Sequence, residues 1–246
     1  MKAPFSSYLA NISGPLKQLL GLLGRHYEYV SILATDSPGF AVRISQHAKS
    51  LSRHTTTTER GIVIRLYRDG GYREYALNDF DPARPEETAA KILADMEQQE
   101  SLLRELGIAY YPTPCLEDEP AEVFVEMETG SLPEEADLAG LVSSLQDVSD
   151  EGMKICPDAI DTMVSAQSTH VNKMFLSAHR DLRQSYVMSE GSVVSLVARD
   201  GMNNYANEIV SGRSGPEIFA GLKPALAKAA AFAEELLDAE RIEPGE

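Results

Sequence analysis

The sequence is poor in cysteine and contains no tryptophan. Its two cysteines, Cys115 and Cys156, are far apart, and neither has a second cysteine nearby to complete a zinc or redox motif. Two thiols in 246 residues are typical of a protein from a reducing compartment. We therefore expect a cytoplasmic protein without a disulfide framework.

Basic residues and long apolar runs are also scarce. The chain has 22 Lys and Arg residues against 38 Asp and Glu residues, a formal net charge of −16, and the basic residues are scattered singly. Such a chain repels a phosphate backbone at long range, so we expect no nucleic-acid partner and attribute the acidic excess to solubility. The apolar stretch 16–23 is too short to cross a bilayer, and no leader pattern precedes it. This predicts no membrane partner.

Catalytic motifs are missing too. None of the five histidines lies in an H-E-x-x-H or H-E-x-x-x-H segment, and no phosphate-binding glycine loop or G-x-S-x-G elbow occurs. We therefore predict no catalytic, cofactor-binding or metal-binding residue in this chain. His47 and His179 are the candidates for an isolated hydrolase. Neither has a nucleophile or an orienting acid paired with it in sequence, and histidines near strand ends more often cap or pack.

Two polar runs have a functional and a plain interpretation. The four threonines at 55–58 could contact phosphate or a peptide through their hydroxyls, but the strand preference of threonine favours an exposed edge or loop before the next strand. The acids Glu117, Asp118 and Glu119 lie in a proline-rich connector, where a solvated charge run is expected and paired-carboxylate catalysis is not.

The first half of the chain predicts a helix, several strands and a second helix. Ser13, Gly14 and Pro15 are typical of a helix start, and Gly24 of its end. Asp69 and the glycines after it predict a tight hairpin turn. Apolar periodicity and β-branched content predict strands at 27–36, 40–46, 61–67 and 72–77 and a helix at 85–106.

The second half follows the same order after a connector. A short strand is predicted inside the connector, at 123–127. In the second half, strands are predicted at 163–168, 173–178 and 191–198, a return strand around 205–207, and helices from 131 and from 215. Arg199, Asp200 and Gly201 form the predicted hairpin turn and match Arg68, Asp69 and Gly70. We interpret this as an internal duplication; a chance similarity of two hairpins is the plain alternative.

Together these patterns predict an α+β (α/β layered) fold. Two helix–strand–strand–strand–helix repeats, at 13–107 and 133–240 and joined by a connector at 108–132, would form a mixed, largely antiparallel sheet covered by helices.

Several segments resemble one known family. An "RG-hydrophobic-R" strand at 60–67, a glycine turn and the stretch 75–79, ending in Asn78 and Asp79, are similar to the N-terminal region of TldD/PmbA proteins, a family also labelled modulators of DNA gyrase. The helix at 85–106 and the segment from Ser177 to Asp181 fit the same pattern, and 241–246 looks like the linker before the family's C-terminal domain. The connector at 108–130 has no counterpart that we can match.

The resemblance implies the N-terminal domain of a zinc metalloprotease family. The family's zinc site, an H-E-x-x-x-H helix and a later cysteine, belongs to a C-terminal domain that we expect to be absent from 1–246, so no zinc ligand carries over. We expect a non-catalytic half, inactive alone, that shapes a peptide-access chamber and a dimer interface. The implied partners are an extended or unfolded peptide and a second subunit, in a homodimer or a paralogue heterodimer.

A second hypothesis is a stand-alone acidic scaffold that binds proteins or peptides without peptidase activity. The gene beyond Glu246 distinguishes the two. An H-E-x-x-x-H segment within the next few dozen codons favours the first, and a stop codon favours the second.

Overall fold

A computed structural model describes residues 1–55, 57–108, 111–240 and 245. The helices and strands follow one another in the order α1 (Ser7–Leu23), β1 (Tyr29–Asp36), β2 (Gly39–Ile44), β3 (Lys49–Ser52), β4 (Arg60–Arg68), β5 (Gly71–Leu77), α2 (Pro85–Glu105), β6 (Ala121–Glu126), α3 (Leu138–Ile155), β7 (Ala159–Ser177), β8 (Arg180–Arg199), β9 (Met202–Gly212) and α4 (Leu222–Leu237). Two short 3-10 segments, Pro133–Glu135 and Pro216–Gly221, precede α3 and α4.

Among the described residues, the strands form one sheet of nine that runs from one end of the molecule to the other. Its centre is the antiparallel pair β7 and β8, of 19 and 20 residues. Both β1 and β2 pair with β7, at opposite ends of that strand, so they lie end to end along it. Further out, β4 and β5 follow β1, and β3 follows β2. On the other side β9 pairs antiparallel and β6 parallel with β8.

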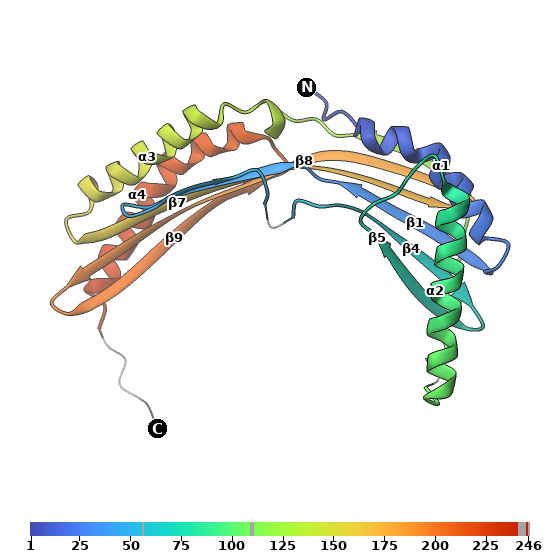
Figure 1. Ribbon diagram of the computed structural model, residues 1–246. Coiled ribbons are helices and arrows are strands. Elements are labelled where there is room, and N and C mark those ends of the chain that lie inside the picture. The colour runs from blue at the N-terminus through green and yellow to red at the C-terminus, as the bar shows by residue number, and fades with distance from the viewer. Residues whose placement is uncertain (56, 109–110, 241–244, 246) are drawn as a thin grey trace.

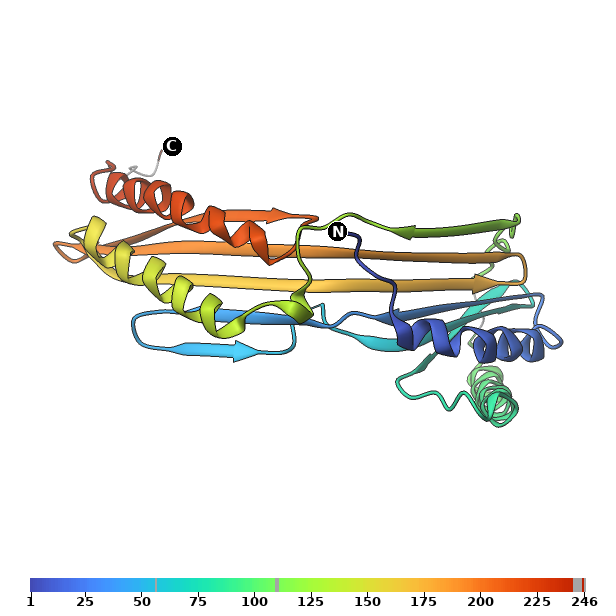
Figure 2. The same cartoon turned by 90° about the horizontal axis from the view of Figure 1, so that it is seen from above.

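The sheet is arched, and the helices lie on its outer side (Figure 1). Figure 2 shows α1 over one end and α3 and α4 over the other. Strand residues alternate between the faces, as the pleat requires. Within the described part of the chain, no helix packs on the concave face, so one whole side of the sheet stays open.

Two large hydrophobic cores lie between the sheet and the helices. The first joins α1 and α2 to β1, β4 and the end of β7 near Met174 and Leu176. The second joins α3 and α4 to β2, β8 and the other end of β7, near Val164 and Ala166. Because β7 contributes to both cores, the two ends of the molecule share one sheet. The predicted α+β class, with helices packed on a largely antiparallel sheet, is confirmed.

Both predicted hairpin turns are present. Asp69 and Gly70 have φ values of 53° and 74°, and Asp200 and Gly201 have 53° and 81°. Two consecutive positive φ angles are typical of a type I′ turn, which glycine and aspartate tolerate and which matches the twist of the flanking strands. The two hairpin turns therefore match in backbone geometry as well as in sequence. The repeat boundaries at 107 and 133 stay a prediction.

The predicted start of the first helix is wrong. We expected it at Ser13, but α1 begins at Ser7, where the Ser6 hydroxyl caps the helix by accepting a hydrogen bond from the Leu9 backbone N–H. Pro15 therefore lies inside the helix. Burial of the face that carries Leu9, Leu16 and neighbouring residues in the first core outweighs the backbone hydrogen bond that proline removes.

Other boundaries also needed correction. The strands predicted at 163–168 and 173–178 are one continuous strand, β7, and β3 was not predicted. The segments that begin near 131 and 215 each start with a 3-10 turn before the α-helix. The strand predicted at 123–127 is confirmed as β6.

The carboxylate of Glu217 ties the connector to the start of the last helical segment. It accepts hydrogen bonds from the backbone N–H groups of Gly130 (3.1 Å) and Gly215 (2.9 Å) and from the hydroxyls of Ser131 and Ser214. Partial burial opposes ionisation, but the hydrogen bonds to the charged form outweigh it and hold the pKa of Glu217 at about 2.

We expect Glu217→Gln to lower the free energy of unfolding by about 1–2 kcal/mol at pH 7, a figure reduced for solvent screening of this exposed side chain. The pKa is below the unfolded value of 4.5, so the stabilisation is complete above pH 4.5 and is lost as the pH falls toward 2. Urea unfolding at pH 7, 4.5 and 3 measures this. Glu235→Gln, on the exposed side of α4, is the control. The prediction is contradicted if the difference in free energy of unfolding between the wild type and Glu217→Gln is as large at pH 3 as at pH 7.

Candidate functional site

The open concave face carries an uninterrupted line of apolar side chains across five strands. The cross-strand pairs Val63–Leu33, Leu33–Phe175, Phe175–Leu182 and Leu182–Val123 place one residue from each of β4, β1, β7, β8 and β6 side by side. We call these five residues the apolar row. Val63, Leu33 and Val123 are 38%, 37% and 48% exposed. Solvent-exposed apolar side chains in one contiguous line indicate a binding surface rather than scattered surface residues.

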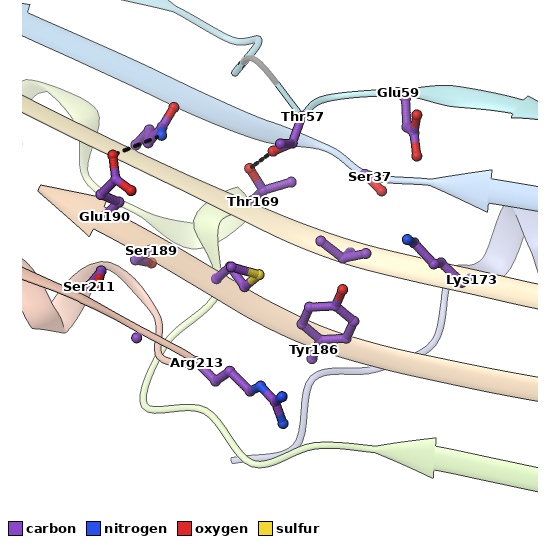
Figure 3. Close-up of a pocket in the computed structure, with 14 residues that line it drawn as sticks. Ser37, Thr57, Glu59, Thr169, Lys173, Tyr186, Ser189, Glu190, Ser211 and Arg213 are labelled. Atoms are coloured by element: carbon purple, nitrogen blue, oxygen red, sulfur yellow. Dashed lines mark hydrogen bonds between the residues drawn. The ribbon is translucent and has the colours of Figure 1, made fainter.

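A hollow of about 740 Å³ lies beside this row at the centre of the sheet (Figure 3). It forms where two neighbouring lines of strands are interrupted. Ser37 and Pro38 separate β1 from β2, and 53–59 separates β3 from β4. We call it the central hollow; its lining residues are Ser37, Thr57, Glu59, Gln167, Thr169, Val171, Lys173, Tyr186, Met188, Ser189, Glu190, Ser211, Gly212 and Arg213.

The central hollow contains charges of both signs. Lys173 comes from β7 and Arg213 from the segment just after β9, and Figure 3 shows the Tyr186 ring between them. Glu190 lies toward the other end, where its carboxylate accepts a 3.4 Å hydrogen bond from Gln167, and Glu59 lies on the wall beside Ser37. Among the described residues, neither Lys173 nor Arg213 forms an ion pair.

A buried hydroxyl also borders the hollow. Ser37 is 1% exposed, and its Oγ has no hydrogen-bond partner within the described part of the chain. A buried polar group without a partner is costly and is often found where a ligand or a water binds. The hollow therefore combines unpaired cations with an unsatisfied hydroxyl.

Part of the threonine run lies at this hollow, through Thr57. Thr55 and Thr57 precede β4, in the loop that was predicted there, and their hydroxyls lie 2.9 and 3.1 Å from the Thr169 hydroxyl on β7. Thr56 lies outside the described residues. The loop is thus fastened to the middle of the sheet, a contact that the sequence did not indicate.

The histidine candidates are not brought together. His47 lies in the turn between β2 and β3 and His179 in the turn between β7 and β8, at opposite ends of the sheet, and both are exposed. His170, which the sequence did not single out, is 4% exposed on the helix-covered side. Its Nδ1 lies 2.8 Å from Glu134 and its Nε2 2.8 Å from the Ser185 hydroxyl. This histidine joins the connector to the sheet.

The acidic connector is not simply a solvated charge run. Asp118 hydrogen-bonds the Ser177 hydroxyl and lies 3.6 Å from Arg180, whose Nε also donates to the Glu119 carbonyl at 2.9 Å. The expectation of a solvated run is therefore wrong for Asp118, because the cation that holds it comes from a distant hairpin.

The described residues contain no group of three or more His, Cys, Asp or Glu side chains placed to hold a metal ion. Cys115 and Cys156 are free thiols. Within the same residues, every helix is too short or too polar to cross a membrane. The prediction that this chain holds no zinc ligand stays a prediction.

Comparison with known proteins identifies the fold. No protein-family model and no curated protein matches the sequence. Similar solved structures include a "putative modulator of DNA gyrase" from Bacteroides thetaiotaomicron (TM-score 0.72, 12% identity, 94% of this chain and 51% of that one) and another from Thermotoga maritima (0.67, 15%, 95% and 50%). TldE from Thermococcus kodakarensis is also similar (0.65, 12%, 89% and 47%).

These likenesses confirm, at the level of the fold, the resemblance to TldD/PmbA proteins that the sequence motifs indicated. The chain spans about half the length of the structures that it matches.

Proposed function

We propose that this chain is the non-catalytic half of a cytoplasmic TldD/PmbA-type zinc metalloprotease and that its concave face forms a wall of the chamber that admits extended polypeptides. The observation that carries the proposal is the one-sided covering of the sheet. Each α-helix in the described part of the chain packs on the convex face, and the apolar row and the central hollow lie on the open one. Likeness to TldE over nearly the whole chain supports the choice of family.

In this proposal the chemistry belongs to the other half of the protein. That half supplies the zinc, which activates water for attack on a peptide bond. The half described here binds the polypeptide and, with a second subunit in a homodimer or a paralogue heterodimer, encloses it. The residues of the concave face would hold the substrate in an extended conformation.

The test compares the whole gene product with the 246-residue chain. We expect the whole product to retain zinc after dialysis and to cleave unfolded polypeptides, and the 246-residue chain to do neither. Metal analysis and a gel-based cleavage assay measure both properties, with a zinc chelator as the control. Absence of zinc and of cleavage in the whole product contradicts the protease assignment.

A second candidate is an acidic scaffold that binds polypeptides without cutting them. The net charge of −16 favours it, because such a protein stays soluble while presenting an apolar surface. In that case the whole gene product binds unfolded polypeptides, contains no zinc and leaves them intact.

A further inference from the structure

We propose that the concave face selects extended polypeptides in which a carboxylate lies two residues from an apolar side chain. The apolar row receives the apolar side chain, and Lys173, with Arg213 beyond it, receives the carboxylate. This inference rests on the proposed function, because it names the substrate feature that the same face recognises.

The spacing comes from β7 itself. Phe175, at the middle of the apolar row, and Lys173, on the wall of the central hollow, are two residues apart and therefore face the same side of the sheet. Their Cα atoms are about 6.8 Å apart, because a strand rises about 3.4 Å per residue. Side chains i and i+2 of an extended ligand have the same spacing. A ligand that lies along β7 can therefore place one side chain on each.

Lys173 lies at the junction of two surfaces. It lines the central hollow together with Tyr186, and it also lines a second depression with Phe175, Leu182 and Val123 of the apolar row. Its aliphatic stem can thus lie along apolar surface while its ammonium group points toward the hollow. A ligand with an apolar side chain beside an anion can therefore contact both the aliphatic stem and the ammonium group of Lys173.

The charges limit the ligand to few carboxylates. Lys173 and Arg213 form no ion pair among the described residues, so a ligand carboxylate does not have to displace an internal partner. Glu59 and Glu190 border the same hollow and repel further anions, as does the net charge of −16. The buried Ser37 hydroxyl, which lacks a partner within the described chain, lies in the wall of the same hollow. A single carboxylate fits this arrangement, and a polyacidic segment does not.

The experiment measures binding by fluorescence anisotropy on the whole gene product, with zinc chelated so that no cleavage occurs. The probes are labelled peptides of about ten residues with one leucine. The first has an aspartate two positions from the leucine and an amidated C-terminus. The second has asparagine in place of the aspartate. The third has the asparagine and a free C-terminal carboxylate two positions after the leucine. The first and third probes distinguish a side-chain carboxylate from a chain terminus.

We expect Lys173→Met to weaken binding of the aspartate peptide about tenfold and to leave the asparagine peptide unchanged, as loss of one charge-assisted contact predicts. Leu33→Ser, in the apolar row, should weaken both about fivefold. Lys49→Met and Leu51→Ser are matched controls on the other face of the edge strand β3, where they should change neither affinity. Raising the salt concentration should weaken binding of the aspartate peptide more than binding of the asparagine peptide.

Two results overturn the inference. Equal affinity of the aspartate and asparagine peptides for the unaltered protein shows that no carboxylate is recognised. A change of oligomeric state in Leu33→Ser, measured by analytical ultracentrifugation, shows that the apolar row is covered by a second copy. Because binding is measured without zinc, the two hypotheses can fail separately. If the whole gene product prefers the aspartate peptide but cleaves no polypeptide, this inference is supported and the protease assignment fails. If it cleaves polypeptides but does not prefer the aspartate peptide, the protease assignment is supported and this inference fails.

Discussion

Replacing Glu100 by alanine should lower the free energy of unfolding by about 3 kcal/mol, because it leaves a buried arginine without its counterion. Glu100, on α2, lies 2.8 Å from Nε of Arg73 on β5 and 2.6 Å from Arg68 on β4. The Arg73 side chain is only 6% exposed, so water cannot replace the lost carboxylate. Carbonyl oxygens of Arg68 and Gly71 still accept from Arg73, which keeps the loss at the lower end of the usual range.

Urea unfolding followed by circular dichroism measures the change. The matched control is Glu74→Ala, which removes an acid from the same sheet region. Glu74 pairs with Arg65 at 2.6 Å, but both side chains are about half exposed, so its loss should cost less than about 1 kcal/mol. Equal losses in the two variants would show that burial does not set the strength of the Glu100 pair.

Gly39→Ala should destabilise the protein by about 2–3 kcal/mol, although it adds only a methyl group. Gly39 begins β2, next to the break at Pro38, and a Cβ atom built there lies 2.5 Å from the Ser168 carbonyl oxygen and 3.1 Å from Cα of Thr169. Both are backbone atoms of β7, which cannot turn aside as a flexible side chain can. The strands must therefore separate at the point where the central hollow forms.

Thermal and urea unfolding give the stability change, and the control is Gly14→Ala. Gly14 lies in α1, and beyond its own stretch of helix nothing comes within 4 Å of a built Cβ, so alanine there should stabilise the helix by up to about 1 kcal/mol. If both variants lost stability equally, close strand contact at Gly39 would not be the cause.

Local chemistry predicted the turns and the strand faces. The Asp-Gly pairs at 69 and 200 indicated both hairpins, since few other residues accept two positive φ angles. The alternation of Ile62, Ile64 and Leu66 identified the buried face of β4, and all three belong to the first core. These features depend on neighbours within a few positions, which is why the sequence was sufficient.

The length of β7 could not be predicted for the opposite reason. Its middle contains Ser168, His170 and Asn172, which resemble a loop between two strands. In the structure they are buried, and each is hydrogen-bonded to a distant partner: Ser168 to Ser189, His170 to Glu134 and Ser185, and Asn172 to the Ser6 backbone N–H. These polar groups find their hydrogen-bond partners only in the assembled fold, so no local sequence pattern predicts that the strand continues through them.

The candidate site was missed for the same kind of reason. Lys173 belongs to β7 and Arg213 to the segment just after β9, and they reach one hollow only through the register of β7 with β8 and of β8 with β9. The five members of the apolar row are likewise aligned by strand pairing alone. Isolated valines and leucines in the sequence do not predict that their side chains will line up across neighbouring strands.

The central position of β7 also determines when the sheet can be completed during synthesis. Ser31 of β1 pairs with Ser177 of β7, so at roughly 5–20 residues per second β1 waits about 7–30 s on the ribosome for that neighbour. Throughout this interval the nascent chain presents an unpaired strand edge, which other chains can join. A ribosome that stalls before β7 would therefore release an aggregation-prone intermediate, and we expect general chaperones to hold this protein during its translation.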